Sequence, residues 1–295
     1  ACLSVEKTRA NTESTARQLA RFADIPARDV GYAGLKDRHA ITRQWFSVRA
    51  PASLDWSGFD AGGVRILRQE RHQRKLRRGA HRGNHFRIAL RGDEIDDAAT
   101  SIESRLAEIS TRGVPNFFGE QRFGRGGANL RLAEDWADGR RLPRHKRGLA
   151  ISTARSVIFN AILRRRVEER SWREILSGEM ANLDGSGSVF AVDEVDEELR
   201  GRCARFDIHP TGTLWGDGAP RGSGQVAELE REVAAEFEKL AAALEKNRVD
   251  AASRSLRLVV KDLSWEFGDD VLWLDFELPK GGFATTVLSE IADTS

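Results

Sequence analysis

The sequence predicts an α+β protein in which one sheet domain is interrupted by a second, inserted domain. Strand-like alternation dominates the first part of the chain, a loop-rich middle part contains two longer helices, and the strand pattern returns near the C-terminus. A chain of 295 residues can bury a substantial core and is expected to form two domains, at roughly 100 to 200 residues per domain.

Short strands and one helix are expected in the first part of the chain. Residues 1–5 have the pattern of a strand that leads into Lys7. Asn11 or Thr12 can cap the helix that follows. Its apolar residues fall on one face, namely Ala16, Leu19, Ala20 and Ala23.

A charged loop presents one carboxylate, that of Asp37, between two expected strands. Residues 30–33 have the pattern of a short strand that ends before a glycine, and residues 44–49 alternate as a half-buried strand does. Lys36 and Arg38 flank Asp37, and nearby cations favour the ionised carboxylate. An ionised, positioned carboxylate suits a nucleophile or a general base, although the triplet alone would also fit a solvated surface turn.

The rest of the chain contains segments with the alternation of strands and segments with the spacing of helices. We expect a strand, a helix, two longer helices and two further strands, in this order, at residues 85–91, 95–109, 152–169, 226–246, 256–260 and 272–278. The segment of residues 209–216 is expected to be a structured loop, with no chemistry assigned to it.

The cations are clustered, although the net charge of +2 says little about binding partners. Residues 65–87 form a dense basic segment in which Glu70 is the one acid, and residues 140–147 form a second basic run. Such segments suit salt-dependent contacts with nucleic-acid phosphates. A solvated basic face of the protein would have the same composition.

Sulfur and hydropathy exclude several classes of protein. Cys2 and Cys203 lie far apart without metal-ligand spacing, which argues for a reduced cytosolic protein with neither a disulfide framework nor a zinc site. No apolar run approaches the roughly 20 residues that span a bilayer, and no signal-peptide pattern occurs. His81 and His85 have metal-like spacing but no third ligand nearby, so we expect no metal.

Several motifs, spread along nearly the whole chain, resemble the TruD family of tRNA pseudouridine synthases in the family's order. The resemblance is carried by residues 31–44 around Asp37 and by residues 7–12, 74–77, 83–86, 113–119, 121–124, 152–160, 209–216 and 282–288. It implies a pseudouridine-synthase fold, with a mostly antiparallel mixed sheet flanked by helices, and an inserted α/β domain. RNA would bind in the cleft between the two domains.

This resemblance also implies the domain boundaries and the setting of the protein. We expect a discontinuous catalytic domain at residues 1–112 and 259–295, and the inserted TRUD domain at residues 113–258. A further segment, with an opening strand and basic residues, is expected upstream of residue 1. The expected protein is cytoplasmic and monomeric.

The activity that the resemblance implies is isomerisation of a tRNA uridine, expected at position 13, to pseudouridine without a cofactor. Asp37 matches the catalytic aspartate of the family. Asn84 and Phe86 match residues that the family places beside that aspartate and against the target base. By spacing alone, Phe86 would be a core residue and Asn84 a turn residue.

Cations in or near these motifs are expected to contact tRNA, the implied partner. They are Lys36, Arg38, Lys75, Arg77, Arg78, Arg122 and Arg155. Arg122 and Arg155 match family positions that line the cleft, but pairing with internal carboxylates would explain them nearly as well. Phe117 and Phe118 could stack on RNA bases, although packing in an apolar hinge between the domains is favoured.

The competing hypothesis is a catalytically silent RNA-binding or RNA-chaperone protein of the same fold. Such a protein would share the basic segment and the cleft but would have no need of Asp37. The expected upstream segment supplies basic residues near the active site in the family, so its absence from this sequence keeps the competing hypothesis open.

Overall fold

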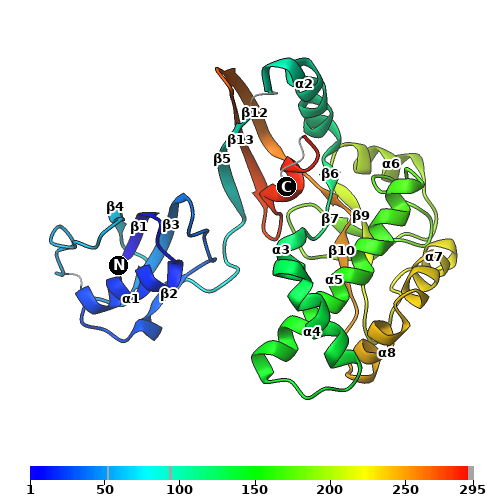
Figure 1. Cartoon of the computed structure of the whole chain (residues 1–295), viewed down its shortest axis with the longest axis horizontal. Coiled ribbons are helices and arrows are strands. Elements are labelled where there is room, and N and C mark those ends of the chain that lie inside the picture. The colour runs from blue at the N-terminus through cyan, green and yellow to red at the C-terminus, as the bar shows by residue number, and fades with distance from the viewer. Residues whose placement is uncertain (52, 93–94, 292–295) are drawn as a thin grey trace. The chain divides into compact units, whose positions relative to one another are not determined.

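Helices and antiparallel strands occur throughout the chain, which confirms the predicted α+β class (Figure 1). The computed structural model describes residues 1–51, 53–92 and 95–291. The chain divides into two units, residues 1–82 and residues 83–295, each with hydrophobic cores of its own.

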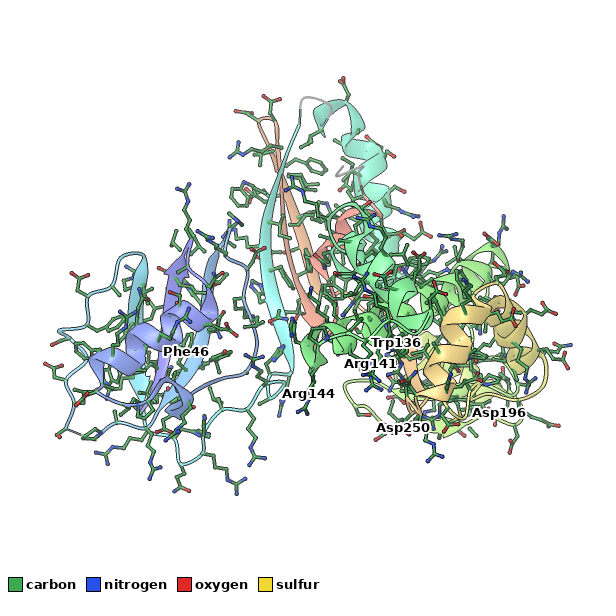
Figure 2. All side chains as sticks on the ribbon, turned by 60° about the horizontal axis from the view of Figure 1, so that its bottom comes forward. Phe46, Trp136, Arg141, Arg144, Asp196 and Asp250 are labelled. Carbon is green, nitrogen blue, oxygen red and sulfur yellow. The ribbon has the colours of Figure 1, made fainter. Side chains whose placement is uncertain are left out.

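The first unit is a four-stranded antiparallel sheet with one helix packed on it. The sheet has the order β2-β3-β1-β4, with the strands Val30–Tyr32, Ile41–Val48, Cys2–Thr8 and Val64–Glu70. A short 3-10 turn, η1 (Ala27–Asp29), precedes β2. Helix α1 (Thr12–Phe22) turns its predicted apolar face toward the fully buried Phe46 of β3 (Figure 2). Fully burying a Leu or Phe side chain is worth about 1.5–3 kcal/mol, so this face determines where the helix packs.

The strands and the helix expected in this unit are confirmed, although Asn11 occupies the N-cap position of α1 without a capping hydrogen bond from its side chain. The opening strand exists and continues past Val5 to Thr8, the helix begins at Thr12, and Asp37 lies on a connection between two strands. Cys2, at the start of β1, is buried.

In the second unit, helix α2 (Ile95–Arg112) packs against a three-stranded sheet of the order β12-β13-β5. Its strands are Lys261–Gly268, Val271–Pro279 and Gly83–Arg91. Leu106 of α2 and Phe276 of β13 are fully buried in the shared core. Strands β5 and β13 and helix α2 were predicted, whereas β12 was missed although Leu263, Trp265 and Phe267 alternate along it.

A second sheet lies in the middle part of the chain, where we expected loops around helices. It has the order β10-β9-β7-β8, with the strands Ala252–Ser255, Ile208–Leu214, Met180–Leu183 and Val189–Ala191. Residues 209–214 therefore form most of a central strand, so the prediction of a structured loop was wrong. Pro210 hid this strand, because proline cannot donate a ladder hydrogen bond and argues against a central strand.

Helices α4 (Ala128–Ala137), α7 (Gly224–Ala235) and α8 (Glu238–Lys246) gather around the long helix α5 (Arg144–Glu168) (Figure 1). The face of α5 toward this core carries fully buried side chains at helical spacing, namely Ala150, Ala154, Ile158 and Ile162. Trp136 of α4 is buried in the same core (Figure 2). Helix α5 begins earlier than the predicted residue 152. The helix predicted over residues 226–246 is in fact two helices, with Phe237 in a non-helical conformation (φ −120°, ψ 36°) before the second.

Shorter elements complete the second unit. Strand β6 (Val114–Pro115) pairs with β11 (Arg257–Leu258). A strand was expected at residues 256–260, and only its residues 257–258 form one. The others are α3 (Glu120–Phe123), η2 (Arg125–Gly127), α6 (Glu197–Ala204) and α9 (Ala284–Leu288). None of the described helices is both long and apolar enough to cross a membrane.

Candidate active site

Asp37 lies in an exposed loop, residues 33–40, that joins the antiparallel neighbours β2 and β3. Its carboxylate oxygen Oδ1 accepts a hydrogen bond of 2.9 Å from the backbone N–H of His39. Such a local bond ties the aspartate side chain to its own loop. The carboxylate is therefore both accessible to a substrate and oriented by the chain that carries it.

The loop rests on a buried lysine. Lys7 of β1 is only 1% exposed, and its Nζ donates to the backbone oxygens of Ala10 at 2.6 Å, Asp37 at 2.8 Å and Lys36 at 3.5 Å. Burial lowers the pKa of Lys7, while the Asp37 carboxylate acts in the opposite direction. Among the described residues no carboxylate forms an ion pair with Lys7, so carbonyl dipoles are its direct partners.

Two polar side chains hold the loop from α1 and β3. The hydroxyl of Thr12 accepts a hydrogen bond of 2.9 Å from the backbone N–H of Lys36 and donates one of 3.0 Å to Oε1 of Gln44. Nε2 of Gln44 donates to the carbonyl oxygen of Gly34 at 3.1 Å. Together with Lys7, these side chains anchor the loop backbone at Gly34, at Lys36 and at the carbonyl group of Asp37, as a positioned catalytic group requires.

Sequence reasoning assigned no role in positioning Asp37 to Lys7, Thr12 or Gln44, although they lie in the motifs. One signal was available in the alternation of β1. Lys7 continues the inward-facing series of Leu3 and Val5, where a cation is unexpected. A buried lysine needs partners, and the nearby loop supplies them as carbonyl groups.

The segment of residues 75–78 crosses closely over β2 and needs a glycine there. A Cβ atom on Gly31 would collide with the carbonyl oxygen of Leu76 and would lie 2.6 Å from Oγ of Ser47. The backbone N–H of Leu76 donates to that same Ser47 oxygen at 2.8 Å. The close crossing thus explains Gly31 in the motif around Asp37.

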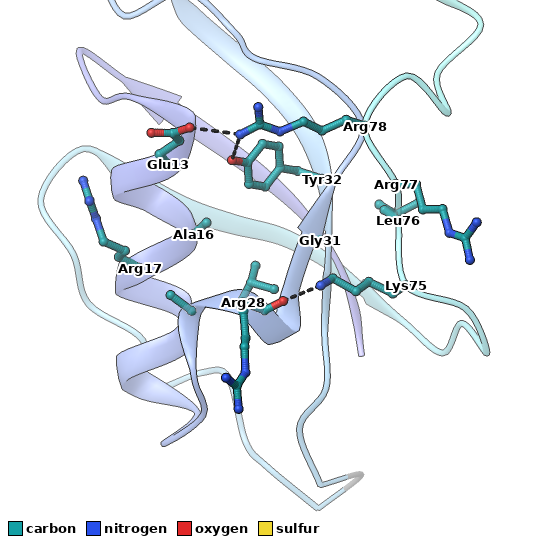
Figure 3. A pocket seen from close by; sticks show the side chains of 12 residues that line it. Glu13, Ala16, Arg17, Arg28, Gly31, Tyr32, Lys75, Leu76, Arg77 and Arg78 are labelled. Atoms are coloured by element: carbon teal, nitrogen blue, oxygen red, sulfur yellow. Dashed lines mark hydrogen bonds and ion pairs between the residues drawn. The ribbon is translucent and has the colours of Figure 1, made fainter. Parts of the chain in front are cut away.

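This crossing forms one wall of an open groove of about 700 Å³, with α1 as another wall (Figure 3). Arg78 reaches back across the groove, where its Nη2 donates to Oε1 of Glu13 and to the hydroxyl oxygen of Tyr32, both at 3.0 Å. Nζ of Lys75 donates to the carbonyl oxygen of Arg28. Arg77 is exposed and points away from α1, and its side chain bonds to no other residue that the structure describes (Figure 3).

The two other cations predicted near Asp37 differ in burial. Lys36 is half-buried, and burial lowers its pKa, whereas Arg38 is exposed.

Asn84 and Phe86 lie on β5 in the second unit. The ring of Phe86 stacks on Phe276 of the neighbouring strand, with 5.5 Å between centroids and 25° between planes. Phe86 is half-buried and packs on the same core as Ile88 and Leu90, as its spacing indicated. Asn84 is half-buried and faces Leu278 in the strand register.

Arg122 and Arg155 do not pair with an internal carboxylate in the described parts of the chain. Nη1 of Arg122 donates to Oγ of Ser152 at 2.9 Å, and Nη2 of Arg155 donates to the carbonyl oxygens of Leu214 at 3.1 Å and Asp250 at 3.0 Å. Burial lowers the pKa of both guanidinium groups. Direct carboxylate pairs therefore explain neither residue, although the carboxylate of Asp250 opposes the lowering of the pKa of Arg155.

The described residues contain no group of three or more His, Cys, Asp or Glu side chains that could hold a metal ion. The family model described as tRNA pseudouridine synthase D (TruD) matches residues 1–133 and 131–291 of the chain. The chain belongs to the TruD family.

Bacterial relatives extend the similarity over nearly the whole chain. A tRNA pseudouridine synthase D from Methylococcus capsulatus is 45% identical over 298 residues, which cover 99% of this chain and 84% of the relative. One from Pseudomonas entomophila is 45% identical over 296 residues, covering 99% of this chain and 83% of the relative. The predicted resemblance is thus confirmed.

A solved structure supports the fold. The crystal structure of a protein assigned as tRNA pseudouridine synthase D (TruD), from Methanosarcina mazei, matches this chain with a TM-score of 0.76. The match covers 98% of this chain and 87% of that chain at 22% identity, a level at which the likeness concerns the fold.

Proposed function

We propose that this member of the TruD family isomerises a uridine of tRNA, at position 13, to pseudouridine, with Asp37 as the catalytic carboxylate and without a cofactor. The observation that carries this proposal is an exposed carboxylate, in the motif that resembles the family's catalytic segment, on a loop braced by Lys7, Thr12 and Gln44.

The reaction breaks the bond between ribose C1′ and uracil N1, turns the base and joins C1′ to C5. Asp37 either attacks C1′, with the uracil as leaving group, or removes the proton from C2′. After the new bond forms, the proton on C5 is lost and N1 gains one, so the reaction needs no net electron or proton. A carboxylate held in place through its backbone suits either role.

We further propose that Asn84 and Phe86 hold the target base, which must leave its stack at a cost of about a few kcal/mol. The proposed contacts with the RNA backbone are Lys36, Arg38, Lys75, Arg77, Arg78, Arg122 and Arg155. We also propose that the protein is a cytoplasmic monomer. Its catalytic domain would comprise residues 1–112 and 259–295, and its inserted domain residues 113–258. The core that α2 and β5 share with β12 and β13 supports joining residues 83–112 to residues 259–295 in that catalytic domain.

The test is pseudouridine formation in an unmodified tRNA transcript, detected by carbodiimide labelling and primer extension. The parent chain should form pseudouridine at position 13, whereas Asp37→Ala and Asp37→Asn should lose product by at least about 10³-fold, because no other group can replace the carboxylate. A transcript with cytidine at position 13 should give no product with any variant.

Asp60→Asn is the matched control, since Asp60 is an exposed carboxylate of the same unit that lies outside both the proposed site and the basic segment. Its activity should equal that of the parent. All variants should bind tRNA alike. Equal product from the parent and Asp37→Ala would rule out Asp37 as the catalytic group. Binding without product from the parent would favour the silent RNA-binding protein.

A further inference from the structure

Two guanidinium groups in the second unit share one aromatic ring. Cζ of Arg254, on β10, lies 4.1 Å from the ring centroid of Phe118, and Cζ of Arg122, on α3, lies 5.1 Å from the same centroid. Neither arginine forms an ion pair with a carboxylate among the described residues. The structure thus gathers two positive charges in one place without a counter-ion from the described chain.

Most donors of these two arginines also lack acceptors. Among the described residues, the side chain of Arg254 donates only through Nη2, to Oδ1 of Asn116 at 2.7 Å and to its carbonyl oxygen at 3.5 Å. Within the same residues, the side chain of Arg122 donates only through Nη1, to Ser152. The Nε atoms of both arginines are buried without a hydrogen-bond partner in the described chain. Nη1 of Arg254 and Nη2 of Arg122 also have no partner among the described residues and are not buried, so these are the donors that a partner from outside the chain can reach.

The burial of the Arg254 charge also favours a bound anion. Burial and repulsion from Arg122 lower the pKa of Arg254 to about 10. The negative face of the Phe118 ring attracts both cations, but such an attraction offsets only part of the cost of removing a guanidinium group from water. An anion bound between the two guanidinium groups would relieve their repulsion and supply the missing acceptors.

The Phe118 ring, which both guanidinium groups contact, is held firmly in place. Phe118 is only 8% exposed, its backbone N–H donates to Oδ1 of Asn160, and Nδ2 of Asn160 donates back to its carbonyl oxygen, both at 2.9 Å. The ring also meets Phe159 edge to face at 5.6 Å. Phe118 is therefore unavailable for stacking on a base, and its place in the site is to hold the guanidinium groups.

We propose that Arg122 and Arg254 form a binding site for one phosphate group of the RNA backbone. The planar forks of N–H donors on two guanidinium groups match the oxygens of a phosphate, which can accept several hydrogen bonds at once. The source of this phosphate rests on the proposed function, which supplies tRNA as the ligand. Arg254 is a new assignment, because it lies outside the motifs that carry the family resemblance.

The first experiment measures tRNA affinity against potassium chloride concentration for Arg122→Met, Arg254→Met and the double variant. Arg200→Met is the matched control, since Arg200 is exposed on α6 and forms no ion pair with a described residue. Each single variant should bind tRNA about 10-fold more weakly than the parent. The magnitude of the slope of log K against log salt should fall by about 0.7–0.9, which is the contribution of one phosphate contact. Because both arginines serve one phosphate, the double variant should lose less than the product of the single effects.

The second experiment measures the melting temperature with added sodium phosphate, against sodium chloride at equal ionic strength. Phosphate should raise the melting temperature of the parent and of Arg200→Met but not of Arg254→Met. The phosphate response decides this test, because Arg254→Met removes a buried charge but also leaves Oδ1 of Asn116 without its donor, so the melting temperature without phosphate can change in either direction. A merely structural arginine would leave the phosphate response of the variant equal to that of the parent.

These outcomes separate the site from the activity. An unchanged salt slope together with an unchanged phosphate response would overturn the proposal. A lost phosphate response with an unchanged tRNA slope would identify a site for free phosphate and overturn the assignment to RNA. If the parent forms no pseudouridine but both responses depend on Arg254, the phosphate site stands while the proposed activity fails.

Discussion

A buried cation that binds backbone carbonyls organises the loop of Asp37. Lys7 binds the carbonyl oxygen of Asp37 within the loop and that of Ala10, which precedes helix α1. An ammonium group suits this place because it is compact and has three donors that can turn toward separate acceptors. The site therefore depends on a residue that we do not expect to touch the substrate.

Replacing Lys7 by Met should slow catalysis more than it weakens tRNA binding. The change leaves buried carbonyl oxygens without a donor, which costs about 1–3 kcal/mol of unfolding free energy, and it frees the backbone of Asp37 to shift. A shift of about 1 Å in a catalytic group can reduce the rate by about 10²-fold. Single-turnover rates and tRNA dissociation constants would measure the two effects separately.

The neighbouring Glu6→Gln variant controls for changes in β1. Glu6 pairs with Arg43 and Arg65, and its side chain is on the opposite face of the strand from Lys7. Its turnover rate should stay near that of the parent. If Lys7→Met loses stability but keeps its turnover rate, Lys7 has no part in positioning Asp37.

At this scale the sequence revealed the exposed reactive group but not its support. The position of Asp37 between two strands followed from periodicity and from Gly34, which are local features. The contacts of Lys7 with the loop bridge about 30 residues of sequence and become visible only when β1 and β3 pair. The uncompensated charge of Arg254 was hidden for the same reason.

A buried carboxyl group joins helix α7 to the central strand β9. Glu230 is only 3% exposed and accepts bonds from the backbone N–H of Thr213 at 2.8 Å and from its hydroxyl at 2.6 Å. Burial raises the pKa of Glu230, and its bonds with Thr213 oppose that shift only in part. The contact between these two elements therefore depends on the protonation of Glu230.

Glu230→Gln should be more stable than the parent at alkaline pH and of equal stability in acid. Because the pKa of Glu230 is higher in the folded state than in the unfolded chain, the group contributes to the free energy of unfolding in full below its unfolded pKa. This contribution is lost as the pH rises through its folded pKa. Gln mimics the protonated carboxyl group, so it removes this loss. Urea unfolding at about pH 4 and about pH 8 would measure the difference.

Two further variants define the origin of that effect. Glu230→Ala should lose about 1–3 kcal/mol at either pH, because the buried N–H of Thr213 loses its acceptor. Glu228→Gln, on the exposed side of the same helix, should follow the pH dependence of the parent. If the difference in unfolding free energy between the parent and Glu230→Gln does not change with pH, this carboxyl group keeps one protonation state.

Elements with a strong local period were predicted well, and those determined by tertiary contacts were not. Helix α2 and strand β13 have continuous patterns and appear where we expected them. Strand β9 contains Pro210, and its place in the sheet comes from pairing with β7 and β10. The break before α8 likewise follows from packing on α5, which no local pattern in residues 226–246 announces.

For the whole molecule, the distribution of charge matters more than its sum. The chain carries 47 Lys and Arg residues against 45 Asp and Glu residues, so it has almost no long-range preference for a polyanion. Contacts with RNA phosphates must then come from local groups of cations. Of the three cations that we propose as phosphate contacts in this segment, Lys75 and Arg78 already have intramolecular partners, which leaves the exposed Arg77.

Arg77→Gln should therefore weaken tRNA binding several-fold near 50 mM salt and lower the slope of log K against log salt by about 0.7–0.9. The effect should be alike for different tRNAs, because a phosphate contact does not read sequence. Arg49→Gln is the control, since Arg49 is an exposed arginine of the same unit that we assign to no RNA contact. If the two variants show the same slope, Arg77 makes no phosphate contact and the basic segment is a solvated face at this position. A reduced slope for Arg77→Gln alone, with the pseudouridine yield restored at low salt, would assign the segment to RNA binding rather than to catalysis.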